Sequence, residues 1–276
     1  MIERLARVLR SAWRSGGFSS GTRAVPQETA IAFTYDTATY AVMMASPGDL
    51  EDFAVGFSLT EQVIPSPDAI EQLEIVESDV DGIAGIELRM WLKGEDGTKL
   101  ARRRRSQVGP TGCGLCGIES LTEALRPPPE VGEGAIYTAD EIMQAVEATG
   151  PLQALNHETR AVHAAGFWTP SEGVVALRED VGRHNALDKL VGALARQGRD
   201  AADGIVVLTS RVSVEMVQKA AFAGAPVIAA VSAPTALAIR MAEAAGITLI
   251  AIARKDGFEV FTHPARVTGE RTSHVA

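Results

Sequence analysis

The chain has 276 residues, a net charge of −9 and 46% hydrophobic residues, but only two cysteines. This length and apolar content fit one or two globular domains whose core needs no disulfide framework, so a reducing, cytoplasmic location is predicted. No apolar stretch approaches the ~18 residues of a membrane span, and the acidic balance argues against general nucleic-acid binding. The sequence therefore predicts a protein that acts neither in a membrane nor on nucleic acid.

Three parts are predicted along the chain. Residues 1–24 form a short, arginine-rich N-terminal extension that lacks the apolar region of a signal peptide and is expected to fray. Residues 25–108 contain short strand patterns and one helix, which predicts a smaller β-rich domain. Residues 109–276 begin with the cysteine-containing loop and continue as a larger domain with a mixed sheet. The predicted fold class is therefore α/β, or α+β when both domains are counted.

Within the smaller domain, apolar alternation predicts a hairpin of strands at 31–35 and 40–44 and a further strand at 86–92. Between them, Ser46 is followed by a proline and, two residues later, by Asp49. A hydroxyl residue before a proline, with an acid in the first turn, is typical of a helix start. The sequence therefore predicts a helix with Ser46 as its N-cap.

In the larger domain, Thr138 and Glu141 have the spacing of a capping box, so a helix is predicted from there to the next Gly-Pro pair. Strands near 161–167 and 174–177 and a helix from about 185 to 197 follow. The last third then alternates short apolar runs with helical patterns. The strands are predicted at 205–208, 227–231 and 247–253, and the helices at 214–222 and 235–245.

This βαβαβ run predicts parallel strands with right-handed crossovers. Ligands in such sheets bind beyond the carboxyl ends of the strands. Those ends carry Arg211, Ser232, Arg254 and Lys255, which predicts a polar and basic binding edge. Ordinary solvated loops are the alternative interpretation.

The two cysteines, Cys113 and Cys116, lie three apart in a glycine-rich segment. Glycines leave the backbone mobile and the sulfurs unshielded, and the arginine run at 102–105 favours thiolate over thiol. Zinc is disfavoured, because no spaced histidine pair is present and no His-x-Glu precedes Cys113. Dithiol exchange usually places such a pair at a helix start, whereas sulfur relay needs an exposed, partly ionised thiol that can carry a persulfide. The loop favours sulfur relay.

Three segments together resemble the FdhD/NarQ family of formate dehydrogenase accessory sulfurtransferases. They are CGLCG at 113–117, EDVGRHNALDK at 179–189 and TSRVS at 209–213. Residues 49–61 and 261–264 are also similar to the family. The resemblance implies that the larger domain has a cytidine-deaminase-like fold without the deaminase zinc signature, and that the protein holds no metal of its own.

The resemblance also implies a function. A cysteine desulfurase would load Cys113 as a persulfide, Cys116 would assist, and the sulfur would go to a molybdenum bis(guanine dinucleotide) cofactor before that cofactor enters formate dehydrogenase. GDP would then bind as a fragment of the cofactor. The implied cofactor-binding stretch consists of Ile252, Ala253, Arg254, Lys255, Asp256 and Gly257. It falls on the same edge as Arg211 and Ser232.

Gly182, Arg183 and His184 precede a predicted helix, where backbone N–H groups favour an anion or pterin. The alternative is that Asn185 caps the helix while Asp180 pairs with Arg183. His163 is expected to be an interior histidine rather than a ligand.

Two other functions compete with sulfur transfer. A chaperone that only holds the cofactor would need the edge but not Cys113, and a dithiol oxidoreductase would need Cys113 and Cys116 equally. Because one chain offers few donors for a cofactor with two nucleotides, a homodimer is also expected.

Overall fold

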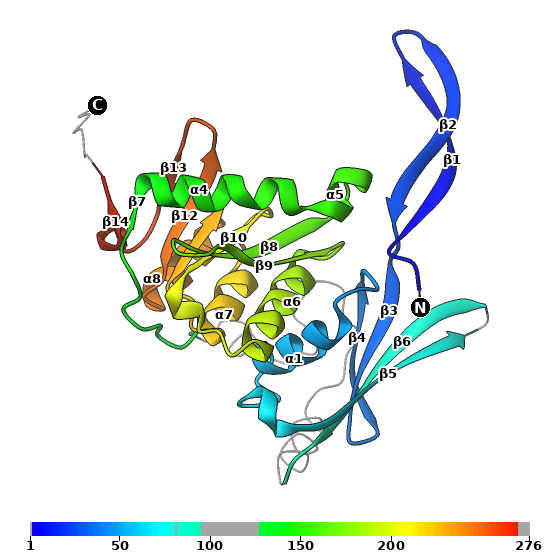
Figure 1. Cartoon of the computed structure of the whole chain (residues 1–276), viewed down its shortest axis with the longest axis horizontal. Helices are drawn as coiled ribbons and strands as arrows, with labels where there is room; N and C mark the ends of the chain where they lie inside the picture. The colour runs from blue at the N-terminus through cyan, green and yellow to red at the C-terminus, as the bar shows by residue number, and fades with distance from the viewer. Residues whose placement is uncertain (1, 81, 95–126, 270–276) are drawn as a thin grey trace.

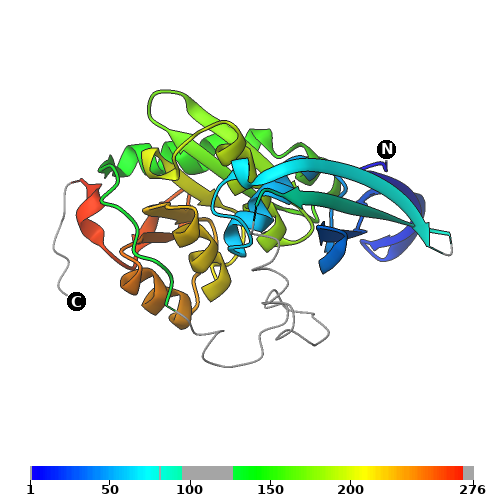
Figure 2. The same cartoon turned by 90° about the horizontal axis from the view of Figure 1, so that it is seen from below.

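The structure is a computed structural model that describes residues 2–80, 82–94 and 127–269. A four-stranded sheet with one helix on one face lies beside a six-stranded sheet that helices cover on both faces, and a hairpin projects from the smaller half (Figures 1 and 2). The α/β fold class with a mixed sheet is confirmed. The smaller half contains β1 (Leu5–Arg14), β2 (Gly17–Pro26), β3 (Thr29–Tyr35), β4 (Ala38–Ala45), α1 (Leu50–Thr60), β5 (Ile70–Val80) and β6 (Ile83–Leu92).

A four-stranded sheet with strand order β4-β3-β6-β5 forms the smaller half, and α1 packs on one of its faces (Figure 1). The predicted hairpin and the strand near 86–92 are confirmed as β3, β4 and β6, whereas β5 was not predicted. Phe33 of β3 makes an edge contact with Phe53 and a stacked contact with Phe57, at centroid distances of 4.9 and 4.0 Å. These rings fix α1 against the sheet, because aromatic pairs add to the energy of apolar burial.

The prediction that Ser46 caps α1 is wrong. The helix begins at Leu50 after Asp49, whose φ of 54° is left-handed and whose side chain makes no capping bond. Ser46 is buried instead, and its backbone N–H donates to Asp180 at 3.0 Å. Its hydroxyl accepts from the N–H of Val181 at 3.1 Å. Ser46 therefore bonds to Asp180, 134 residues away in the sequence, instead of capping the nearby helix α1.

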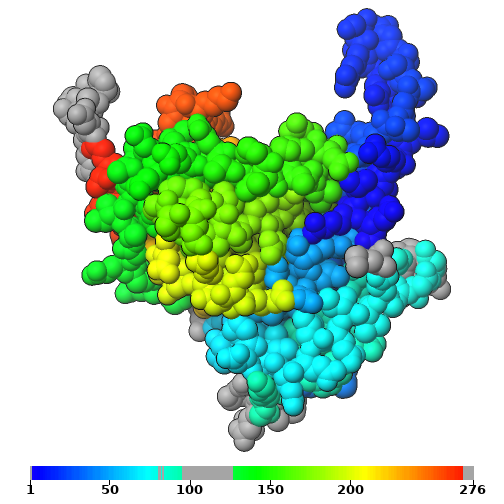
Figure 3. Space-filling model, in the orientation of Figure 1, coloured from blue at the N-terminus to red at the C-terminus, as the bar shows by residue number. Residues whose placement is uncertain are grey.

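The N-terminal residues do not fray but form an antiparallel hairpin, β1–β2, paired from Leu5 and Pro26 to Arg14 and Gly17. Its turn has positive φ at Ser15 and Gly16, at 51° and 83°. This is the turn geometry that matches the twist of a two-stranded ribbon. We call the hairpin the arm, because it stands away from the rest of the molecule (Figure 3).

The larger half is built on a six-stranded sheet with order β13-β12-β11-β10-β8-β9. The predicted parallel pairing of β10 with β11 and of β11 with β12 is confirmed, and β8 runs antiparallel to both of its neighbours. The elements are β7 (Tyr137–Thr138), α4 (Ala139–Thr149), α5 (Ala154–Thr159), β8 (His163–Thr169), β9 (Gly173–Asp180), α6 (Arg183–Arg196), β10 (Ile205–Leu208), α7 (Val214–Phe222), β11 (Val227–Ala230), α8 (Ala236–Ala244), β12 (Thr248–Arg254), β13 (Gly257–Val260) and β14 (Val267–Thr268).

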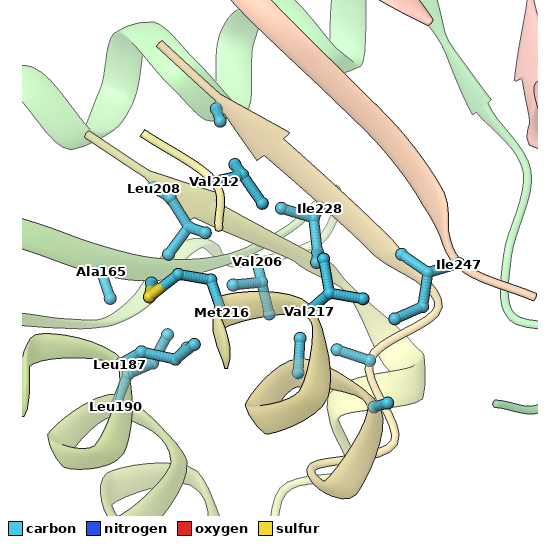
Figure 4. Close-up of a cluster of buried hydrophobic side chains, with 14 of the residues drawn as sticks. Ala165, Leu187, Leu190, Val206, Leu208, Val212, Met216, Val217, Ile228 and Ile247 are labelled. Carbon is cyan, nitrogen blue, oxygen red and sulfur yellow. The ribbon is translucent and has the colours of Figure 1, made fainter. Parts of the chain in front are cut away.

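Helices cover both faces of this sheet, with α4 on one side and α6, α7 and α8 on the other (Figure 1). Residues along β10 alternate between two cores. Val206 and Leu208 face Leu187, Leu190 and other side chains of α6 and α7 (Figure 4). The remaining residues of β10 pack in the cluster that includes α4. Burial on both faces explains why these strands are apolar runs without alternation.

The predicted capping box of α4 is present. The N–H of Glu141 donates to the Thr138 hydroxyl at 3.2 Å, and the N–H of Thr138 donates back to the Glu141 carboxylate at 2.8 Å. Within the described residues, no helix has the length and hydropathy that crossing a membrane requires.

Helices α1 and α6 join the two halves where Gly56 meets Gly192. A Cβ at Gly56 would clash with the backbone oxygen of Asp188, and one at Gly192 with that of Asp52. Glycine is therefore needed at both positions for the helices to approach this closely. Charged side chains flank the crossing, since Asp52 accepts from Arg178 of β9 at 2.8 Å.

Candidate functional site

Strand directions bring four loops of the larger half to one edge. Because β8 is antiparallel to both β9 and β10, strands β9, β10, β11 and β12 all run the same way. Their carboxyl ends, together with the amino end of β8, form what we call the carboxyl edge. This is the position at which open α/β sheets bind ligands.

Backbone bonds hold neighbouring loops of the carboxyl edge together. The N–H of Ile252 donates to the carbonyl of Ser232 at 3.2 Å, and the N–H of Val212 donates to that of Ala233 at 3.3 Å. Arg211, directly before Val212, is exposed. The structure thus places the loops of Arg211, Ser232 and Ile252 in a row, as the strand pattern predicts.

Ile252 lies in a β-bulge of β12, where the pairing with β13 shifts between Ala251 and Arg254. Its φ of 55° is left-handed, which is an outlier for a β-branched residue. Such bulges and strained positions occur next to functional sites, where they redirect the chain. The stretch predicted to bind the cofactor therefore contains a bulge at Ile252, and its pairing with β13 resumes at Arg254.

The rest of that stretch lies on the β12–β13 hairpin, which projects past the carboxyl edge (Figure 1). Arg254 pairs with Gly257, and Lys255 and Asp256 form the turn between them. The three charged residues are exposed, whereas Ala253 is only 1% exposed. The hairpin therefore offers two cations and one carboxylate to solvent, and Ala253 can contribute only its backbone.

At the other end of the carboxyl edge, α6 begins directly after Gly182, with Arg183 and His184 in its first turn. The alternative in which Asn185 caps this helix and Asp180 pairs with Arg183 is wrong. Asn185 donates to the carbonyl of Met44 and to Asp180, at 2.9 and 3.0 Å.

Asp180 is fully buried, and its ionic partner is Lys189 at 2.6 Å. Lys189 also donates to the carbonyl of Ser46 at 2.8 Å. Burial lowers the pKa of Lys189, and the carboxylate of Asp180 opposes that shift. Arg183 and His184 are thus not engaged by Asp180 and lie at the helix start beside the edge.

Four side chains at the starts of α6 and α7 form what we call the α6–α7 cluster: Arg183, His184, Ser213 and Glu215. Each has a buried nitrogen or oxygen atom with no hydrogen-bond partner in the described part of the chain. The closest ionic approach is 3.8 Å, from His184 Nε2 to Glu215 Oε2. Buried polar atoms left without partners are costly and mark a site for a ligand or an ordered water.

The electrostatics of the α6–α7 cluster are set by its histidine. The His184 imidazole is the main cause that lowers the pKa of Glu215 to about 2, with help from Ser213 and against the effect of burial. His163, at the amino end of β8, is half-buried at the edge rather than interior. Burial, followed by the charges of Arg183 and His184, lowers the pKa of His163. The Glu215 carboxylate therefore lies close to side chains that can donate hydrogen bonds, those of His184 and Ser213.

Sequence reasoning missed Glu215 as a site residue. An acid in the first turn of a helix is common, because it complements the helix dipole, so its position alone carries no functional signal. Only the 3.8 Å distance from Glu215 to His184, on a different helix, identifies Glu215 as a candidate site residue. Cys113, Cys116 and the arginine run at 102–105 lie outside the described residues.

The structure also contains a cleft of about 700 Å³ between the two halves. It is lined by residues 62–67, by the carboxyl end of α6 with Arg199, and by Phe222 at the end of α7. Because α6 and α7 start at the carboxyl edge, this cleft lies at their opposite ends. It is therefore separate from the candidate site.

The sequence is similar to proteins named "Sulfur carrier protein FdhD". The relative from Agrobacterium fabrum is 52% identical over 263 residues, covering 95% of each chain. The relative from Brucella abortus is 53% identical over 257 residues, covering 93% of this chain and 94% of its own.

A crystal structure from Desulfotalea psychrophila, described as that of a formate dehydrogenase accessory protein, matches with a TM-score of 0.76. It is 23% identical, and the match covers 96% of this chain and 100% of the other, which establishes the likeness of the fold. The model of the FdhD/NarQ family matches residues 26–268. Because this match spans most of the chain and the relatives are identical at about half of their positions, the chain belongs to the FdhD/NarQ family.

Proposed function

We propose that this protein is a cytoplasmic sulfurtransferase that carries sulfur on Cys113 from a cysteine desulfurase to a molybdenum bis(guanine dinucleotide) cofactor, for a formate dehydrogenase. Relatives named sulfur carrier proteins and a fold neighbour described as a formate dehydrogenase accessory protein support the general role. The observation that carries the proposal is the carboxyl edge. There, exposed Arg211 lies in the loop that leads to the α6–α7 cluster, whose buried atoms lack partners among the described residues, and the exposed cations of the β12–β13 hairpin lie at the opposite end of the same edge.

The loading step needs only a thiolate on this chain. The Cys113 thiolate attacks the terminal sulfur of the desulfurase persulfide and forms a new S–S bond. The S–S bond of the donor breaks, and its cysteine leaves as a thiolate, so no outside oxidant or reductant is required. Cys116 assists the later delivery of that sulfur.

The cofactor is the acceptor substrate, and the chemistry of the carboxyl edge suits its pyrophosphates. Arg183, Arg211, Arg254 and Lys255 place cationic side chains at this edge. The first-turn N–H groups of α6 add donors for an anion. The cofactor carries two guanine nucleotides, and a homodimer would supply one such edge to each.

Mass spectrometry after incubation with a desulfurase and cysteine tests the carrier step. We expect Cys113 to gain one sulfur atom, Cys113→Ser to gain none, and Cys116→Ser to keep the gain with a smaller loss of formate dehydrogenase activation. A chaperone would activate formate dehydrogenase with Cys113→Ser, and an oxidoreductase would lose activity equally in both variants without gaining sulfur. Either result would contradict the proposal.

Calorimetric titration with GDP tests the nucleotide site. GDP should bind and ATP should bind poorly, and Arg254→Ala with Lys255→Ala should weaken GDP by about 1–3 kcal/mol through lost charge-assisted bonds. Arg240→Ala, which removes an exposed cation on α8, is the matched control and should leave GDP affinity unchanged. Equal affinity in all three proteins would remove the hairpin from the nucleotide site.

A further inference from the structure

The α6–α7 cluster combines groups of opposite hydrogen-bonding character. Helices α6 and α7 lie side by side on one face of the sheet, and the cluster lies where both helices begin (Figure 1). Glu215 supplies a carboxylate, which only accepts hydrogen bonds when it is ionised, whereas Arg183 supplies a guanidinium, which only donates. His184 and Ser213 can donate as well. A ligand that satisfies the cluster must therefore offer both donors and acceptors.

The side chains of the cluster do not satisfy one another. Four of their polar atoms are buried and lack a hydrogen-bond partner among the described residues: Arg183 Nε, His184 Nε2, Ser213 Oγ and Glu215 Oε2. The 3.8 Å between the last nitrogen and oxygen of the His184–Glu215 pair is longer than a hydrogen bond. Electrostatic attraction within this pair therefore leaves polar atoms that a ligand can still bond.

The cluster is largely shielded from water but is not closed. The side chains of His184 and Glu215 are 13% and 14% exposed, and Ser213 is 9% exposed. The His184 imidazole is the main cause that lowers the pKa of Glu215 to about 2, so this carboxylate is ionised at neutral pH. Hydrogen bonds to a desolvated carboxylate are strong, and an unmatched polar group that faces it is costly. The cluster should therefore distinguish rings that differ by one polar group.

The charges of the cluster disfavour several kinds of ligand. A phosphate offers only acceptors, so the carboxylate of Glu215 repels it, and Arg183 repels the guanidinium of a peptide arginine. Adenine carries a ring nitrogen without a hydrogen beside its amino group. Uracil carries a carbonyl oxygen on each side of its ring N–H. Either base would set an acceptor against the carboxylate, and neither therefore fits the cluster.

One type of ring edge matches the cluster. It carries in a row an exocyclic NH₂ group, a ring N–H group and a carbonyl oxygen, and we call it the amino-oxo edge. The first two groups donate to the two oxygens of a carboxylate, as the two N–H groups of an arginine do, and the carbonyl oxygen accepts from a neighbouring cation. Guanine has this edge, and a pterin ring has the same edge. Both rings occur in the cofactor that is the proposed acceptor of sulfur.

We propose that Glu215 selects the ring of the bound ligand: its carboxylate accepts from the NH₂ and N–H groups of the amino-oxo edge, while Arg183 or His184 donates to the carbonyl oxygen. This inference rests on the proposed function, and it assigns a ring rather than a pyrophosphate to the α6–α7 cluster. The phosphates of the same ligand would lie towards the exposed Arg211, two residues before Ser213. It also gives the expected preference for GDP over ATP a physical cause.

Ligand pairs that differ only in the amino group test this assignment in the unmodified protein. GDP is compared with IDP by calorimetry, and pterin is compared with 4-hydroxypteridine by fluorescence titration. Loss of one charge-assisted hydrogen bond should weaken binding by about 10-fold or more in at least one pair. The pair that shows this loss identifies the bound ring as guanine or as a pterin. Equal affinities within both pairs would overturn the proposal without any variant.

The variant Glu215→Gln tests which residue selects the ring. A glutamine amide donates where one carboxylate oxygen accepts, so it matches a ring whose amino group is replaced by a second carbonyl. The variant should lose the selectivity within the ligand pair. It should also bind xanthosine diphosphate, or lumazine in the pterin case, about 10-fold more tightly than the unmodified protein does. Such a gain of affinity cannot arise from unfolding.

Glu147→Gln makes the same chemical change on the exposed side of α4 and is the matched control. It should keep the ring selectivity of the unmodified protein. A folded Glu215→Gln protein that also keeps this selectivity would refute the role of Glu215.

Failure of this inference and failure of the proposed function give different results. Ring selectivity is measured without a desulfurase or a persulfide, whereas sulfur transfer is measured by the mass of Cys113 in the unmodified protein. Sulfur on Cys113, with equal affinities within both ligand pairs, would refute only the role of Glu215. Selectivity within a pair, with no sulfur on Cys113, would refute sulfur transfer and leave the assignment of Glu215 intact.

Discussion

At the scale of single residues, the carboxyl edge depends on side chains that different helices bring together. His184 starts α6 and Glu215 starts α7, and each is placed by a glycine or serine that precedes its helix. Among the residues that the structure describes, the closest ionic approach of either side chain is the 3.8 Å between them. Both side chains can therefore bind a ligand. The effect of His184 on the pKa of Glu215 also makes the stability of the fold depend on pH.

Glu215→Gln should change how stability depends on pH. The folded-state pKa of about 2 lies below the ordinary 4.5, so the unfolded chain binds more protons between these values. The contribution of Glu215 is thus present above about pH 4.5 and is lost as pH falls towards 2. Glutamine does not titrate, so the free energy of unfolding of the variant should fall less between pH 5 and 3.

Urea unfolding at several pH values, followed by tryptophan fluorescence, measures this difference. Glu147→Gln, on the exposed side of α4, is the control and should follow the unmodified protein. Parallel curves for Glu215→Gln and the unmodified protein would show that His184 does not stabilise the Glu215 carboxylate.

At the scale of elements, the crossing of α1 and α6 is set by the absence of side chains. Gly56 and Gly192 each face the backbone of the other helix, so the two helix axes approach closely. This approach positions the start of α6, and with it Arg183 and His184, relative to the smaller half. A larger residue at either glycine should therefore push the two helices apart and disturb the whole interface.

Gly192→Ala should destabilise the protein, although alanine favours an isolated helix by about 1 kcal/mol over glycine. The added Cβ would clash with the backbone oxygen of Asp52, and overpacking of this kind costs about 1–3 kcal/mol. Thermal or urea unfolding measures the change. Gly132→Ala, where an added Cβ meets nothing within 4 Å, is the control. An equal or higher stability of Gly192→Ala would contradict the close crossing.

At the scale of the whole molecule, buried charges connect the two halves. Lys219 of α7 donates to Asp188 of α6 and to Thr60 of α1, both at 3.0 Å. It also donates to Glu61 at 3.1 Å. Burial acts to lower the pKa of Lys219, but the charges of Asp188 and Glu61 outweigh it and raise the pKa. The amine therefore stays charged and satisfies oxygen atoms from both halves.

Lys219→Met should destabilise the protein by about 3–5 kcal/mol, because it leaves the carboxylate of Asp188 buried without its cation. Adding Asp188→Leu should recover most of this loss, since an apolar pair can replace a buried ion pair. Urea unfolding of the single and double variants measures both effects. Arg199→Met, which breaks an exposed pair with Glu172, is the control and should change stability little. A double variant no more stable than Lys219→Met would refute the pairing.

The amino-acid sequence by itself determined the elements whose signals are local. The hairpin β3–β4, the capping box of α4 and the parallel strands β10, β11 and β12 follow from periodicity and end signals within a few residues. That the loops after these three strands share one edge follows as well, because parallel strands end at the same edge. The family resemblance rested on sequence motifs of the same local kind.

Only the tertiary structure decided which distant residues form hydrogen bonds and ion pairs with one another. Ser46 reads as a helix cap, yet it bonds to Asp180, and the partner of Asp180 is Lys189 rather than Arg183. Residues 1–24 read as a short, arginine-rich extension that frays, yet they form most of the arm. Local patterns specify helices and strands, but the partner of a polar side chain depends on which elements pack together. That choice minimises unpaired buried groups over the whole chain, so no short stretch of sequence contains it.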